Sequence, residues 1–168
     1  MVSRMSMKKN IRHIVFDWGD TLMRDFTENT GPMCDWDYIE LLPAIPEVLP
    51  KLFEHYSLTV ATNAGISDTA MMRKALIRGG VEHFFSHFFS SKDLGVSKPD
   101  PEFFKQVCIN AGFEPSESLM IGNDYHKDIV GSHEVGMKTV LFNHAKVQGP
   151  FPLVDFELQD ISDLLKII

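Results

Sequence analysis

The sequence predicts an α/β fold in three layers, with a doubly wound, mostly parallel sheet of five strands between two layers of helices. Short apolar segments without polar alternation recur along the chain, which is typical of parallel strands covered on both faces. Between them lie longer segments with apolar residues at helical spacing, and this alternation favours right-handed crossovers. The chain has 168 residues, of which 44% are hydrophobic, which suffices for one domain with a sizeable core.

Five segments are predicted as strands. Each is short, mostly apolar and followed by residues that favour turns. The segments are RHIVFD (12–17), SLTVAT (57–62), FFSS (88–91), SLMIG (118–122) and KTVLF (138–142).

Five further segments are predicted as helices. Residues 45–56 have apolar side chains at helical spacing, although Pro50 should limit this helix. Residues 67–80 begin on a Ser–Asp cap and end at two glycines. Residues 99–113 carry proline in the first turn and a glycine near the end. The other two predicted helices are 125–137 and 158–168.

Residues 23–45 are polar, acidic and turn-rich, and they do not fit the alternation of strands and helices. About twenty residues without periodicity inside a compact domain usually form a functional loop. With Trp36 and Tyr38, this loop is the best candidate for substrate contact. The alternative is a solvated acidic loop whose aromatic residues pack on the core. We expect residues 1–10 to be a flexible segment and residues 11–168 to form a single domain.

The composition excludes several classes of partner. The net charge of −7 argues against broad electrostatic binding of nucleic acid or membrane, so any phosphate recognition must be local. No apolar run approaches the length of a membrane span, and the start of the chain lacks a signal core. Cys34 and Cys108 have no paired spacing, which indicates neither a disulfide framework nor a zinc site. We therefore expect a cytoplasmic protein, and the pattern leaves its oligomeric state open.

Polar side chains follow four of the predicted strands. Because ligands bind beyond the carboxyl ends of parallel strands, we expect these side chains to meet at one edge of the sheet. A carboxylate, a hydroxyl, an amide, a lysine and a second acidic segment suit a phosphoryl group held with a divalent cation. The residues are Asp17, Thr62, Asn63, Lys98, Asn123 and Asp124.

In their order and spacing these motifs resemble the haloacid dehalogenase superfamily of aspartate-nucleophile phosphatases, over about residues 11–165. The family's D-x-D-x-T motif is similar to DWGDT (17–21), and its strand ending in Ser or Thr is similar to the strand ending at Thr62. Its lysine motif is similar to KPDP (98–101), and its fourth motif, G-D-x-x-x-x-D-I, resembles GNDYHKDI (122–129). The resemblance implies the Rossmann-like core of this family.

The resemblance also implies how the site is covered. Family members often carry a cap domain after the first motif, or between the second and third motifs. Only forty residues separate Thr21 from Thr62, and they include a helix and most of a strand. We therefore expect no large cap domain, and a site that is open to small or larger phosphorylated substrates or closed by a partner subunit.

The family mechanism implies a role for each motif residue. Asp17 would attack phosphorus and form an aspartyl-phosphate, while Thr62 and Asn63 would bind the transferring oxygens with nearby backbone N–H groups. Lys98 would neutralise phosphoryl charge and keep Asp17 ionised. The implied cofactor is Mg²⁺, which prefers oxygen ligands. Its candidate ligands are Asp17, the backbone carbonyl of Gly19, Asn123, Asp124 and Asp128.

Two positions depart from the family pattern. The general acid/base usually lies two residues after the nucleophile, where this chain has Gly19, and a carboxylate follows at Asp20. Asp20 is the candidate replacement if the freedom of Gly19 turns it inward; the alternative is that it hydrogen-bonds the turn. Asn123 stands where the first acid of the fourth motif is usual, which lowers the charge available to a metal. Asp128 is then the better-aligned acid, and Asp124 the expected direct ligand.

Two functional hypotheses follow. The first is a Mg²⁺-dependent phosphatase for phosphoric monoesters or acyl and aryl phosphates, with alkyl phosphates slower because Gly19 cannot donate a proton. The second is a non-catalytic or very weakly active phosphate-binding or regulatory protein, since the usual acid and the usual metal ligand are both replaced. A dehalogenase is a third possibility that the residues favour less. The dehalogenases of the family have a larger aromatic residue in place of Gly19, and they need no Mg²⁺.

Overall fold

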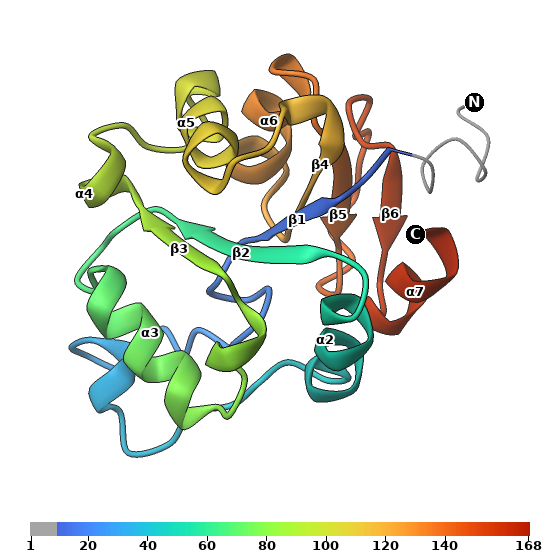
Figure 1. Cartoon of the computed structure of the whole chain (residues 1–168). Coiled ribbons are helices and arrows are strands. Elements are labelled where there is room, and N and C mark those ends of the chain that lie inside the picture. The colour runs from blue at the N-terminus through green and yellow to red at the C-terminus, as the bar shows by residue number, and fades with distance from the viewer. Residues whose placement is uncertain (1–9) are drawn as a thin grey trace.

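The centre of the molecule is a six-stranded sheet in which every pair of neighbouring strands is parallel (Figure 1). The computed structural model describes residues 10–168, so nearly all of the expected flexible segment 1–10 lies outside the described residues. The strands are β1 (His13–Phe16), β2 (Ser57–Thr62), β3 (His87–Ser90), β4 (Ser118–Gly122), β5 (Lys138–Phe142) and β6 (Phe156–Leu158).

The strand order is β3-β2-β1-β4-β5-β6, so the direction of winding reverses between β1 and β4. This order confirms the predicted doubly wound α/β architecture. It also places the carboxyl ends of β1, β2 and β4 side by side at the switch point, where ligands of open α/β sheets bind.

Helices cover both faces of the sheet, with α5 and α6 on one side and α2 and α3 on the other (Figure 1). The helices are α2 (Ile45–Phe53), α3 (Thr69–Arg78), α4 (Ser91–Leu94), α5 (Pro101–Ala111), α6 (Gly131–Glu134) and α7 (Leu164–Ile167), and a π-helix, η4 (Tyr125–Val130), precedes α6. Single 3₁₀ turns are η1 (Met33–Asp35), η2 (Glu82–Phe84), η3 (Pro115–Glu117) and η5 (Ile161–Asp163).

Residues of the central strands alternate between two apolar layers, as the pleat of a strand requires. Ile14 and Phe16 of β1 face the layer that includes α2, α3 and α7. Val15, between them, faces the layer of Phe103 and Phe104 from α5. Both faces of the central strands are therefore buried, which explains their continuous apolar sequence.

The structure corrects three element predictions. The sheet has a sixth strand, because Phe156–Leu158 pairs with β5 as a three-residue edge strand that is too short for a local pattern. The helix predicted at 158–168 is reduced to η5 and α7, since the Asp160 side chain accepts from the Ser162 N–H and starts a new turn. The helix predicted at 125–137 is η4 followed by α6.

The loop 23–45 is ordered and docks on α3. Arg78 Nη1 donates to the carbonyl oxygens of Cys34 and Trp36 at 2.8 and 2.7 Å. Trp36 packs partly buried against the core, whereas Tyr38 is 62% exposed. The core-packing alternative therefore holds for Trp36.

The described residues also bear on three sequence-based predictions, which concern a cap domain, the two cysteines and a membrane span. Residues 10–168 contain no large cap domain. Cys34 and Cys108 are both buried free thiols. Within the same range, no helix has the length and apolar character that crossing a bilayer requires.

Candidate active site

The predicted site residues meet in one polar pocket at the carboxyl ends of β1, β2 and β4. The pocket has a volume of about 320 Å³. Every residue proposed from the sequence lines it, together with two that were not proposed, Asp25 and Lys127. The predicted members are Asp17, Gly19, Asp20, Thr62, Asn63, Lys98, Asn123, Asp124 and Asp128.

Lys98 lies at the floor of this pocket between two carboxylates. Its Nζ donates to Asp17 Oδ1 and to Asp128 Oδ1, both at 2.7 Å, and to the Ala61 carbonyl oxygen at 3.2 Å. All three ammonium donors are thus used. Burial alone would lower the pKa of Lys98, but the charges of Asp128 and Asp17 outweigh it and raise the pKa. Lys98 is therefore a fixed cation beside the Asp17 carboxylate.

Asp128 is held from both sides. Its Oδ2 accepts from the Asp124 backbone N–H at 3.0 Å, while its Oδ1 faces Lys98. Burial and the charge of Asp17 raise the pKa of Asp128, and the contact with Lys98 opposes this rise. Because both oxygens are engaged, Asp128 is in the first place the partner of Lys98, and its role as a metal ligand stays a prediction.

Two glycines let the fourth motif close on the lysine motif. A Cβ on Gly122 would lie 2.2 Å from Asp128 Oδ2, and a Cβ on Gly131 would lie 2.2 Å from the Pro99 carbonyl oxygen. Real Cβ atoms do not approach other atoms so closely, so a side chain at either position would push η4 away from Lys98.

Asn63 holds the backbone of Lys98. Its Nδ2 donates to the Lys98 carbonyl oxygen at 3.0 Å, and its Oδ1 accepts from the Lys98 N–H at 2.8 Å. The amide is thus occupied in joining the β2 end to the lysine loop, and its predicted phosphate contact stays a prediction. Thr62 is buried at the pocket wall, and its hydroxyl donates to the Asn63 carbonyl oxygen over 3.3 Å.

Oxygen donors suited to a hard cation lie on the other side of Asp17. The Thr21 hydroxyl is 3.1 Å from Asp17 Oδ2 and 3.3 Å from Asn123 Oδ1, so these two oxygens converge. Asp124 caps η4 by accepting from the Lys127 N–H and also lines the pocket. Within residues 10–168, no three His, Cys, Asp or Glu side chains cluster as a metal site. The oxygen donors of Asp17, Asn123 and Asp124 include only two carboxylates. Such a donor set fits Mg²⁺, which completes its coordination shell with water and substrate phosphate.

The Asp20 side chain hydrogen-bonds its own turn, which is the predicted alternative to an inward orientation. Its φ is +56°, and its Oδ1 accepts from the Asp25 N–H at 3.0 Å. The Asp20 carbonyl oxygen accepts from His144 Nε2 at 2.8 Å. Asp20 still borders the pocket, and its role as the catalytic acid stays a prediction.

Asp25 is the acidic pocket residue that sequence reasoning missed. An ideal Cβ on Gly19 would lie 3.7 Å from both Cβ and Oδ2 of Asp25. Partial desolvation, followed by the charges of Asp20 and Asp17, raises the pKa of Asp25. The one signal in the sequence was that Asp25 follows Gly19 by six residues in a turn-rich segment. Spacing along the chain cannot show that the turn brings Asp25 back to Gly19.

Two further pockets adjoin the polar one. A pocket of about 530 Å³ shares Asp20, Asn123 and Asp124 with it and has mainly apolar walls, including Phe142 and Phe151. A second, of about 420 Å³, shares Gly19, Asp25, Thr62 and Asn63 with it, and its other lining residues include Phe26, Met33, Trp36 and Ile66. Both offer room for the part of a substrate that lies beyond a phosphoryl group.

Sequence comparison identifies the family. The sequence model described as haloacid dehalogenase-like hydrolase matches residues 5–142. Glyceraldehyde 3-phosphate phosphatase from Methanopyrus kandleri is 32% identical over 133 residues, which are 76% of this chain and 57% of that protein. The protein of the same name from Pyrococcus abyssi is 32% identical over 136 residues, 78% of this chain and 56% of its own length. The chain thus spans a little over half the length of these curated relatives.

Solved structures show the same fold. An uncharacterized protein from Listeria monocytogenes serotype 4b superposes with a TM-score of 0.80 at 24% identity, covering 94% of this chain and all of that chain. The putative HAD-hydrolase YfnB from Bacillus subtilis, solved bound to magnesium, gives a TM-score of 0.78 at 19% identity, covering 95% and 99%. With its four motifs gathered in one pocket, the chain belongs to the haloacid dehalogenase-like hydrolases.

Proposed function

We propose that this protein is a phosphatase that hydrolyses phosphoric monoesters, or acyl and aryl phosphates, through an aspartyl-phosphate on Asp17. The observation that carries the proposal is the Asp17 carboxylate, held 2.7 Å from the buried ammonium of Lys98 in a polar pocket. The named activities of the relatives support a small phosphorylated substrate, since they include glyceraldehyde 3-phosphate phosphatase and phosphoserine phosphatase.

The residues divide the reaction into two displacements. An Asp17 oxygen forms a bond to phosphorus while the bond from phosphorus to the leaving oxygen breaks. Water then attacks the phosphorus of the aspartyl-phosphate, and the bond to Asp17 breaks to release inorganic phosphate. Lys98 offsets the negative charge that accumulates beside Asp17 in both steps.

The donor set described above fits Mg²⁺. Asp17, the Gly19 carbonyl oxygen, Asn123 and Asp124 would hold the ion. When bound, it supplies positive charge that allows an anionic nucleophile to approach an anionic phosphate.

An activated aryl phosphate tests the nucleophile without involving the general acid. The nitrophenolate of p-nitrophenyl phosphate leaves without being protonated, so its hydrolysis depends mainly on Asp17 and Lys98. With Mg²⁺ present, we expect Asp17→Asn to lose activity by on the order of 10³-fold or more. Acid-quenched wild-type protein should carry a phosphoryl group on the peptide that contains Asp17. As a matched control, Glu47→Gln on the exposed side of α2 should retain wild-type turnover.

A second candidate is a phosphate-binding protein without turnover. It is favoured by Gly19 and Asn123, which leave the pocket without two of the family's usual carboxylates. In that case titration calorimetry would detect phosphate binding that needs Lys98. Wild type and Asp17→Asn would then be equally inactive on p-nitrophenyl phosphate, and this result would overturn the phosphatase proposal.

A further inference from the structure

We propose that Asp25 is the general acid and general base of this site, in place of the side chain that Gly19 lacks. The proposal rests on the phosphatase function proposed above. It assigns a catalytic residue from a different turn of the chain, eight residues after the nucleophile instead of two.

The first argument is position. Apart from the chain neighbours of Gly19, the nearest atoms to an ideal Cβ on this residue all belong to Asp25, with Cβ and Oδ2 at 3.7 Å and Cγ at 4.0 Å. These are ordinary van der Waals distances. The Asp25 carboxyl group thus borders the space that a side chain at residue 19 would enter.

The second argument is the turn that brings Asp25 there. The Asp20 N–H donates to the Met23 carbonyl oxygen at 2.7 Å, and Gly19 and Met23 form a bridge. The Asp20 side chain then accepts from the Asp25 N–H at 3.0 Å. These contacts fold residues 19–25 back on themselves, so the position of Asp25 is set by hydrogen bonds instead of by sequence spacing.

The third argument is availability. In the described part of the chain, the Asp25 carboxylate has no hydrogen-bond or ion-pair partner, whereas the Asp20 carboxylate is engaged by a backbone N–H. Asp25 is also exposed and lines the pocket, so a substrate can reach it.

The fourth argument is the location of Asp25 between two pockets. Asp25 lines the polar pocket with Asp17 and Lys98, and it also lines the neighbouring pocket with Phe26 and Trp36. In a phosphate ester the leaving oxygen lies between the phosphoryl group and the organic part. An ester that occupies both pockets therefore places its leaving oxygen near Asp25.

The proton transfers balance over the two displacements. As the bond from phosphorus to the leaving oxygen breaks, the Asp25 carboxyl group gives its proton to that oxygen and becomes a carboxylate. In the second displacement this carboxylate takes a proton from the attacking water while oxygen bonds to phosphorus and Asp17 leaves. Asp25 ends protonated, and the products are an alcohol and phosphate.

The test compares two leaving groups in one variant. We expect Asp25→Asn to lower kcat/KM for β-glycerol phosphate by about 10²- to 10⁴-fold, since an alkoxide needs a proton donor. For p-nitrophenyl phosphate the loss should stay within about 3-fold, because kcat/KM there covers only a first displacement that needs no acid. A burst of nitrophenolate should appear in this variant, since hydrolysis of the aspartyl-phosphate lacks its base. Glu28→Gln, an exposed acid of the same loop, is the matched control for lost charge and should leave both values unchanged.

A relocation variant tests the equivalence of the two positions. Gly19 has no left-handed φ, and its nearest side chain is Asp25 itself, so Gly19→Asp has room once Asp25 is truncated. We expect the double variant Gly19→Asp, Asp25→Ala to recover at least about tenfold of the β-glycerol phosphate activity that Asp25→Ala loses.

The outcomes separate this inference from the proposed function. If Asp25→Asn affects both substrates equally, or neither, the assignment of Asp25 is wrong while the phosphatase proposal stands. If wild type hydrolyses neither substrate, the phosphatase proposal fails, and the assignment fails with it. Melting curves that match wild type exclude misfolding of the variants as the cause.

Discussion

At the scale of single residues, Lys98 connects the proposed chemistry of the site with the stability of the fold. Its ammonium is buried between Asp17 and Asp128, and all of its donors are used by oxygens of the first, second and fourth motifs. An ion pair of this kind need not be more stable than apolar packing, but breaking it leaves buried charges without a partner.

Lys98→Met should therefore destabilise the protein by about 3–5 kcal/mol and abolish hydrolysis. The reason is that Asp128, almost fully buried, loses its cation. Urea unfolding measures the stability term. Adding Asp128→Asn to Lys98→Met should restore part of the stability and none of the activity, and a double variant as unstable as the single one would contradict this account.

Gly122 is a second residue at which packing and chemistry meet. Gly122→Ala places a methyl group 2.2 Å from Asp128 Oδ2, so we expect a loss of about 1–3 kcal/mol and a fall in activity as Asp128 shifts from Lys98. Gly65→Ala, with nothing within 4 Å of the new methyl, is the control and should unfold like wild type. A Gly122→Ala variant of wild-type stability would show that η4 adjusts freely.

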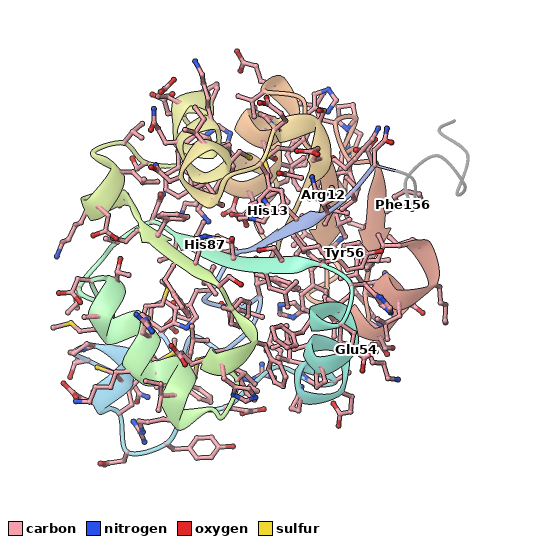
Figure 2. The ribbon with its side chains drawn as sticks, viewed as in Figure 1. Arg12, His13, Glu54, Tyr56, His87 and Phe156 are labelled. Atoms are coloured by element: carbon pink, nitrogen blue, oxygen red, sulfur yellow. The ribbon has the colours of Figure 1, made fainter. Side chains whose placement is uncertain are left out.

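At the scale of elements, a polar row crosses the sheet at a distance from the pocket. One ring nitrogen of His13 in β1 forms a hydrogen bond with the Ser118 hydroxyl of β4 at 2.9 Å, and the other with the Thr59 hydroxyl of β2 at 2.7 Å. His87 of β3 lies opposite Thr59 in the strand register, and both histidines are labelled in Figure 2. Burial, followed by the charge of His87, lowers the pKa of His13 to about 4. The row thus contains a neutral imidazole in the native sheet.

This row predicts how stability depends on pH. The unfolded chain protonates His13 near pH 6.5, whereas the native state does so near pH 4, so the native state is favoured above this window. Stability should fall as pH drops from about 6.5 to 4, by up to about 3 kcal/mol from His13. Urea unfolding at several pH values measures this slope. His13→Gln should flatten it, and an unchanged slope would place the titration elsewhere.

The docking of the loop 23–45 on α3 is a second element-scale feature. Arg78 satisfies two carbonyl oxygens of this loop, so Arg78→Ala should cost about 1–3 kcal/mol and speed hydrogen exchange of residues 30–38. Lys74→Ala, whose contact with Asp35 is exposed, is the matched control and should change exchange little. Equal exchange in both variants would mean that apolar packing alone orders the loop.

At the scale of the whole molecule, the sheet edge gathers oxygens from β1 and β4 that suit a magnesium ion. Mg²⁺ bound to the native state alone should raise the melting temperature, and Asp17→Asn should reduce this rise. Asn123→Asp adds a carboxylate beside Asp17 and should increase it. Thermal unfolding with and without Mg²⁺, and with Ca²⁺ as a comparison, measures the effect. Identical shifts in all three proteins would exclude a site between Asp17 and Asn123.

The architecture was largely predictable because it depends on local patterns. Apolar runs such as SLMIG and KTVLF correspond to strands within a residue of the predicted bounds, since a strand covered on both faces must be apolar throughout. The edge strand β6 was missed because three residues with one partner leave no such pattern.

The sequence by itself determined the order of the strands along the chain and the polar residues at their ends. It did so because side-chain periodicity and covalent order are enough to place Asp17, Thr62 and Asp124 at one sheet edge. Only the tertiary structure decided the partners within that edge. Asn63 bonds the Lys98 backbone, Asp128 faces the Lys98 ammonium, and Asp25 returns to Gly19. These pairings depend on turn geometry and on atoms brought together from distant segments, which the spacing of residues along a chain does not contain.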